Sequence, residues 1–194
     1  MHRLSSLPVD NLDPEQRQLF DMVMGGKRSV GRSLQDFLDA DGSMRGPFNA
    51  LLHHPRAGSV VQRLGEILRF EGNLTDVQRE VAILTVGRHW QAQYEWWAHA
   101  KIAANVGVPR DVIHAIKEQV PLPSNKADIT GIYEFVRELT EARKVSQRCF
   151  DAVHTLLGDS GVVELVILVG YYGIISAVLN TFQVPLPEGA TPPF

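Results

Sequence analysis

The strongest constraint on the fold is one long apolar segment near the end of the 194-residue sequence, residues 160–180. Within it, the most apolar stretch is interrupted by Glu164, two tyrosines, Ser176 and glycines. A membrane-spanning helix needs roughly 20 predominantly apolar residues with few or no charges. The segment therefore predicts a buried helix of a soluble protein rather than a membrane span.

The rest of the chain shows helical periodicity and no convincing strand pattern. Asp13-Pro14 is typical of a helix start, because Asp can cap and Pro is favoured at the first helical position. Thr75 and Gln78 have the spacing of a capping box. The sequence predicts an all-α protein, with helices at about residues 14–24, 46–56, 57–71, 76–87, 91–105, 109–118, 128–142, 146–157 and 160–180.

The domain organisation follows from these elements. We expect an N-terminal arm and helix in residues 1–45, a helical domain in 46–183 and a Pro-rich tail in 184–194. Segment 76–86 resembles segment 160–170, so that Glu80 aligns with Glu164. This likeness is compatible with two related helical halves, and equally with two buried helices that use the same residue types.

Composition excludes several classes of partner. The formal net charge is −3 and no segment is rich in Lys or Arg, so no nucleic-acid partner is expected. One cysteine, Cys149, cannot form an internal disulfide, which favours a reducing compartment. The N-terminal residues lack the apolar core of a signal peptide. We expect a cytoplasmic protein.

A set of chemically useful side chains lies between residues 88 and 99. Glu95 and His99 are four residues apart, so a helix places them on one face. Ala92 precedes Glu95 by three residues, and Trp96 lies beside Ala92 and His99. Arg88 comes one turn before Ala92 if the helix extends that far. An acid, an imidazole, an aromatic wall and a small residue are suitable material for a small-molecule pocket.

Glu80 adds a second carboxylate from the preceding helix, in an apolar stretch of sequence. A carboxylate beside a histidine fixes the imidazole tautomer and raises its pKa toward the operating pH. These properties suit acid–base catalysis by Glu80, Glu95 and His99.

The spacing of these residues resembles a known pattern: Glu80, eleven residues, Ala92, two residues, Glu95, three residues, His99. It is similar to the carboxymuconolactone decarboxylase and alkylhydroperoxidase-like superfamily, as are the flanking segments VAILTVGRHW and AKIAANVGVPRDVIHAI. The peroxidase branch has a Cys-x-x-Cys pair where this chain has Ala92 and Glu95; the decarboxylase branch lacks that pair. The resemblance covers residues 46–118 well. It implies an alkylhydroperoxidase-like helical array and a homo-oligomer, a trimer or hexamer.

The resemblance also implies a reaction. Disulfide-cycling peroxidase chemistry needs two thiols, so the decarboxylase branch is favoured. The implied enzyme is a cofactor-free lyase that removes CO₂ from a small carboxylated lactone in aromatic catabolism. His99 would be the general acid and Glu95 would orient it. Glu80 would relay a proton or donate to an oxyanion. Arg88 would hold a substrate carboxylate, Trp96 would exclude water, and Ala92 would leave space for the substrate.

Other interpretations stay open at this point. The chain could be a peroxidase-related protein with another reductant, or a non-catalytic binding or structural oligomer. His53-His54 and the Glu80 cluster are the candidate metal ligands, but no His-x-x-x-His or cysteine set accompanies them, so no metal is predicted. His89 could join the site. Tyr94, Trp96 and Trp97 also suit a core or a subunit contact, and Glu164 suits a buried polar pairing.

Overall fold

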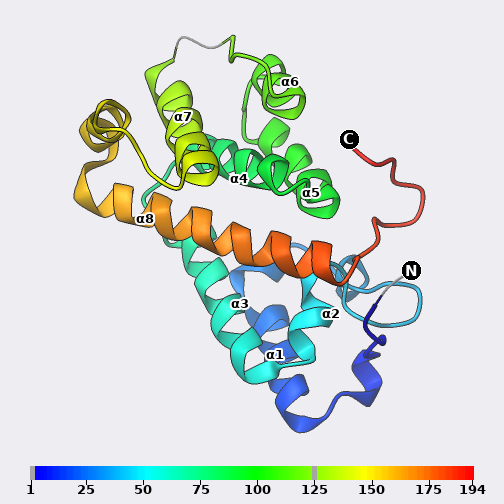
Figure 1. Cartoon of the computed structure of the whole chain (residues 1–194). Helices are drawn as coiled ribbons and strands as arrows, with labels where there is room; N and C mark the ends of the chain where they lie inside the picture. Colours follow the sequence, from blue (N-terminus) through cyan, green and yellow to red (C-terminus); the bar gives the residue numbers. More distant parts are fainter. Residues whose placement is uncertain (1–2, 124–125) are drawn as a thin grey trace. The chain divides into compact units, whose positions relative to one another are not determined.

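The structure is a computed structural model that describes residues 3–123 and 126–194 (Figure 1). Within these residues the only β-type pairings are two isolated bridges, Pro8 with Ser43 and Leu38 with Met44. The prediction of an all-α protein is confirmed. The α-helices are α1 (Pro14–Gly25), α2 (Pro47–Leu52), α3 (Pro55–Phe70), α4 (Asp76–His89), α5 (Gln93–Asn105), α6 (Arg110–Glu118), α7 (Ala127–Ala142) and α8 (Gln147–Thr181).

The chain forms two compact units. The first extends to Glu71 and includes Val178–Thr191; the second contains Gly72–Ala177 and Pro192–Phe194. Helix α8 thus supplies residues to both. The domain limits expected from the sequence, 1–45, 46–183 and 184–194, stay a prediction.

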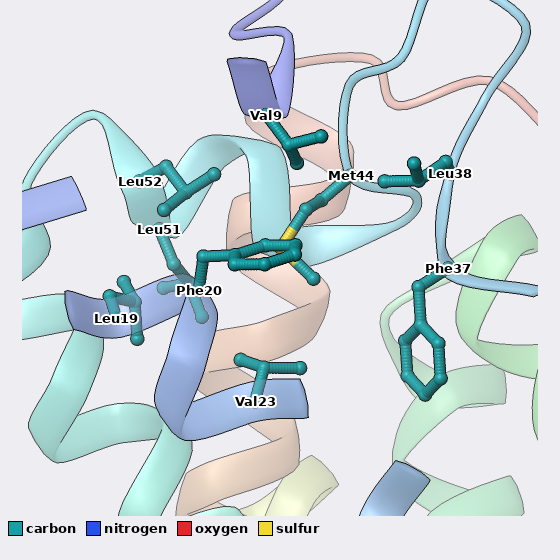
Figure 2. Packing of buried hydrophobic residues seen from close by; sticks show 9 residues of the cluster. All are labelled: Val9, Leu19, Phe20, Val23, Phe37, Leu38, Met44, Leu51 and Leu52. Atoms are coloured by element: carbon teal, nitrogen blue, oxygen red, sulfur yellow. The ribbon is translucent and has the colours of Figure 1, made fainter. Parts of the chain in front are cut away.

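The first unit is built on helices α1, α2 and α3, which pack against one another. Helix α1 begins with a capping box in which Asp13 and Gln16 each bond the other's backbone N–H, as the Asp13-Pro14 pair predicted. The buried faces meet in an apolar cluster that loop residues complete (Figure 2): Val9, Leu19, Phe20, Val23, Phe37, Leu38, Met44, Leu51 and Leu52.

Pro55 has the opposite role from the one expected. The sequence suggested that it closes the helix spanning residues 46–56, but it opens α3 as its first residue. Proline is favoured there because its missing N–H needs no partner and its fixed φ is already helical. The His54 side chain caps the same end by accepting a hydrogen bond from the backbone N–H of Ala57.

Helix α4 is central to the second unit, where it packs against α5, α6 and α7. Every residue in Val81–Gly87 is buried, so this helix is enclosed on all sides rather than amphipathic. The predicted capping box between Thr75 and Gln78 is present at its start. Just before it, Glu164 accepts hydrogen bonds from the backbone N–H groups of Asn73 and Leu74. The expected polar pairing of Glu164 is thus a contact with loop backbone.

Helix α8 consists of two helical segments that meet at a kink, in the interval between the predicted helices 146–157 and 160–180. Gly158 lies inside it with φ 66° and ψ −178°, which is a kink rather than helical backbone. By length and composition alone α8 could cross a membrane, and half of its most apolar window is buried inside the protein.

The kink generates a stability prediction. The backbone angles of Gly158 fall in a region that is essentially restricted to glycine, so Gly158→Ala should cost about 1–3 kcal/mol of unfolding free energy. No atom lies within 4 Å of the position a Cβ would take there, so the cost is conformational. Gly131→Ala is the matched control, because Gly131 is helical and its Cβ would make only an ordinary contact with Val153. Urea denaturation measures both, and equal effects would contradict the argument.

Candidate functional site

The second unit brings Glu80, Glu95 and His99 together. The Nδ1 atom of His99 lies 2.7 Å from Oε2 of Glu80, and its Nε2 atom lies 3.1 Å from Oε1 of Glu95. The three residues are 0%, 4% and 6% exposed, respectively. We call them the carboxylate–imidazole trio. Glu80 comes from α4 and the other two from α5, four residues apart as predicted.

The trio depends on how α4 passes into α5. Gln91 takes a left-handed conformation (φ 50°), and the backbone N–H of Ala92 bonds the carbonyl of Gly87. Helix α5 then begins after Ala92. The reversal lays the first turn of α5 against the end of α4, so that the Glu95 side chain lies close to Gly87.

The helix that carries Glu95 and His99 does not extend back to Arg88, which was the condition for Arg88 to share their face. Arg88 and Ala92 are on opposite sides of the break between α4 and α5. Arg88 lies in the last turn of α4, while Ala92 is the fully buried N-cap residue of α5. The left-handed conformation of Gln91 interrupts the helix, so Arg88 and Ala92 do not belong to one continuous helical face.

The electrostatics favour a protonated imidazole. Burial by itself lowers the pKa of His99, but the carboxylates of Glu80 and Glu95 outweigh it and raise the pKa above its ordinary value of 6.5. With both ring nitrogens facing carboxylate oxygens, the protonated ring donates a hydrogen bond to each. The two carboxylates therefore shift the balance of His99 toward its protonated form.

The hydrogen bonding of the trio is incomplete. The Oε1 atom of Glu80 is buried and has no hydrogen-bond partner among the described residues. A buried unpaired carboxylate oxygen is costly, and such groups are rare in folded proteins. This orphaned acceptor distinguishes the trio from a saturated structural network.

A tyrosine that the sequence analysis had not selected completes one wall. The Tyr172 ring on α8 meets the His99 ring edge-on, with centroids 5.3 Å apart and an interplanar angle of 83°. Tyr172 is 2% exposed and also contacts Tyr171. Its only signal in the sequence was the pair of tyrosines in an otherwise aliphatic helix.

Two of the predicted substrate-binding residues meet at a different aromatic side chain. Trp96 contacts the Phe194 ring edge-on with centroids 5.6 Å apart, and the Arg88 guanidinium carbon lies 4.7 Å from the centroid of the same ring. Arg88 also donates from Nε to the carbonyl of Lys117 at 2.6 Å. Nothing in the sequence pointed to Phe194.

Arg88 also borders a small polar cavity of about 130 Å³. Its lining comes from α4, α6, the residue that follows α6, and α7: Thr85, Arg88, His89, Ile116, Gln119, Tyr133, Arg137, Thr140 and Glu141. His89 therefore lies with Arg88 in the lining of this cavity. The trio does not line this cavity.

The aromatic residues of α5 point in different directions. Trp96 is buried, whereas Tyr94 and Trp97 are partly exposed and pack on each other with centroids 5.6 Å apart. Lys101 lies over the Trp97 ring at 4.1 Å. Tyr94 and Trp97 thus form an outer surface rather than a wall of the trio.

The candidate thiol and metal ligands lie elsewhere or have other partners. Cys149 is on α8, and burial raises the pKa of its thiol to about 11. His53 bonds the carbonyl of Ser5. Among the residues that the structure describes, no group of three or more His, Cys, Asp or Glu side chains is arranged to hold a metal ion.

Comparison with known proteins identifies the fold. The crystal structure of an alkylhydroperoxidase AhpD core, an uncharacterized peroxidase-related protein from Ralstonia eutropha JMP134, matches with a TM-score of 0.74 and 16% identity, covering 96% of this chain and 93% of that one. An uncharacterized peroxidase-related protein from Silicibacter sp. TM1040 matches with a TM-score of 0.69 and 12% identity, covering 97% and 92%. This chain has the alkylhydroperoxidase-like fold. The predicted helical array is confirmed.

Sequence comparison adds no further match. No protein-family model matches the chain, and no curated protein matches it. At these identities the alkylhydroperoxidase-like likeness establishes the fold and leaves the reaction to the site itself.

The trio generates a titration prediction. We expect His99 to titrate above 6.5, and Glu80→Gln to lower that pKa more than Glu95→Gln does, because Glu80 is the larger electrostatic contributor. Nuclear magnetic resonance of the histidine ring carbons measures all three proteins. Glu118→Gln, an exposed change at the end of α6, should leave the His99 titration unchanged. The same His99 pKa in every variant would contradict the coupling.

Proposed function

We propose that this protein is a cofactor-free acid–base enzyme related to carboxymuconolactone decarboxylases, and that it acts on a small carboxylated lactone in the cytoplasm. The observation that supports this most is the buried imidazole of His99, paired with two carboxylates that raise its pKa. A general acid must hold its proton at the operating pH and release it on demand.

The reaction would use that proton as follows. The bond between a ring carbon of the substrate and its carboxylate breaks, and CO₂ leaves. The electron pair moves into the conjugated lactone carbonyl. A proton from the trio then reaches the ring carbon, and solvent returns a proton to His99. No electrons are exchanged with a cofactor, so the step balances without a redox partner.

The carboxylates have different roles in this proposal. Glu80 is fully buried and holds Nδ1 at 2.7 Å, so it stabilises the imidazolium and fixes the ring. Glu95 holds Nε2 at the longer distance of 3.1 Å and retains slight exposure. The proton would therefore leave through Nε2, either passed on by Glu95 or donated directly once Glu95 turns aside.

A peroxidase-related activity is the second candidate, because both structural neighbours are described by those words. In this chain it would need an external reductant and a different reacting group. The one cysteine, Cys149, is buried with a raised pKa, whereas reactive thiols have lowered ones.

The decisive measurement is turnover of 4-carboxymuconolactone, followed by substrate loss and CO₂ release. His99→Gln should reduce kcat about 10²–10⁴-fold, the range of general acid catalysis. His114→Gln, at an exposed position of α6, should leave kcat unchanged. Activity should fall as pH rises through the raised pKa of His99, because the proton is lost there, and Glu80→Gln should move that fall to lower pH.

The same proteins should be offered tert-butyl hydroperoxide with dithiothreitol. Lactone turnover that depends on His99 supports the lyase. Hydroperoxide consumption without lactone turnover, abolished by Cys149→Ala, would replace it with a cysteine peroxidase. If neither activity is observed, a non-catalytic oligomer is the better description of the protein.

A homo-oligomer, a trimer or hexamer, is also part of the proposal. Its support is an exposed apolar stripe along α8 formed by Val163, Val166, Ile167 and Ile174, which are 43–58% exposed. Patches of this kind on soluble proteins mark interaction sites.

Sedimentation equilibrium measures this association. Ile167→Glu should shift the protein toward monomer, because it places a charge in an apolar contact. Val30→Glu, at a residue 78% exposed in a loop, should not. A wild-type protein that is monomeric at all concentrations would refute the oligomer.

A further inference from the structure

The environment of Phe194 is that of a bound aromatic ligand. Its ring and the Trp96 ring form a T-shaped pair with centroids 5.6 Å apart and an interplanar angle of 73°, and the guanidinium carbon of Arg88 lies 4.7 Å from the centroid of the Phe194 ring. These are two of the contacts that proteins use to hold aromatic rings, a T-shaped ring pair and a cation over the ring face. We call Arg88, Gln93 and Trp96 the ring cradle.

Gln93 holds the backbone of the same residue. Its Nε2 donates a hydrogen bond to the carbonyl oxygen of Phe194, and its Oε1 accepts one from the Phe194 N–H at 3.4 Å. One side chain thus satisfies both backbone groups, while Arg88 and Trp96 hold the ring. These three side chains come from the end of α4 and the first turn of α5.

The segment Pro192–Phe194 is held mainly by the contacts of Phe194 with the ring cradle. The described residues 182–194 form no helix or strand, and Pro192 is exposed. Phe194 is only partly buried, so its ring keeps contact with solvent. Proline has no N–H to donate, which leaves Phe194 as the residue of Pro192–Phe194 that can donate a backbone hydrogen bond. A contact made by one partly exposed residue can be displaced by a free molecule of the same chemistry.

The cradle also carries a charge that a phenyl ring does not satisfy. The side-chain hydrogen bond that Arg88 makes to the carbonyl of Lys117 uses Nε, which leaves the two Nη groups available. A ring that bears a carboxylate would use both properties of this guanidinium, its planar face and its N–H donors.

We propose that the ring cradle is a binding subsite for a flat, carboxylate-bearing ring, and that Phe194 occupies it as an intramolecular competitor. The inference deepens the proposed function, since it identifies where the ring of a substrate or product is held. The inference that this ring belongs to the substrate or product rests on the proposed function; binding of the ring by itself does not. Trp96 lies between Glu95 and His99 on α5, so ring binding and the trio share one helix.

The test is benzoate binding to the full chain, measured by calorimetry. If Phe194 fills the cradle about nine-tenths of the time, Phe194→Ala should bind benzoate roughly 10-fold more tightly than wild type. Gln93→Ala, which frees the backbone and leaves the ring of Phe194 intact, should give a smaller gain. Phe150→Ala is the matched control, because Phe150 is exposed and stacks on His154 of its own helix.

The site is located by two further readouts. In Phe194→Ala, benzoate should shift the indole N–H resonance of Trp96 and leave that of Trp90 in place. Arg88→Ala in the same protein should abolish the gain. Equal affinity of wild type and Phe194→Ala, or shifts at Trp90 alone, would overturn the inference. These measurements need no turnover, so a protein that binds benzoate as expected but leaves the lactone intact fails only as a lyase.

Discussion

Burial of the Glu80 carboxylate is the constraint around which the second unit is organised. Helix α4 is enclosed on all sides, and Glu80 is fully buried within it. An isolated carboxylate in such a place would cost several kcal/mol, far more than most single interactions contribute. A positively charged partner is therefore required, and His99 of α5 supplies it at 2.7 Å. The pairing ties the two helices together and determines the side of α5 that faces inward.

The second carboxylate gives this arrangement its chemical character. One acid would suffice to neutralise an imidazolium, but His99 has one on each nitrogen. Both carboxylates raise the pKa of the ring, and one oxygen of Glu80 has no partner among the described residues. Side chains whose pKa values are shifted by burial and by specific charged partners cluster at functional sites.

Many of these features could be predicted from the sequence, because they depend on residues that are close together along the chain. Helix starts were predicted where a cap and its partner are close in sequence, as at Asp13 and Thr75. Glu95 and His99 were paired correctly because helical geometry alone brings residues four apart together. The breaks were also anticipated: the chain turns at Gln91 and leaves helical geometry at Gly158, both between helices that the sequence had separated. The error was Pro55, which was expected to close one helix and instead opens α3, because proline suits the first position of a helix as well as the position after its end.

By itself the sequence determined the helical class, the inward face of α5 and the trio's membership, because these depend on residue types at short, regular spacings. The tertiary structure alone decided which nitrogen of His99 faces which carboxylate, that Tyr172 borders the imidazole, and that Phe194 sits between Arg88 and Trp96. Apart from the Glu95–His99 pair, which is four residues apart, those contacts join residues from about twenty to more than one hundred positions apart. Their formation depends on how whole helices and the tail pack, which no local pattern encodes.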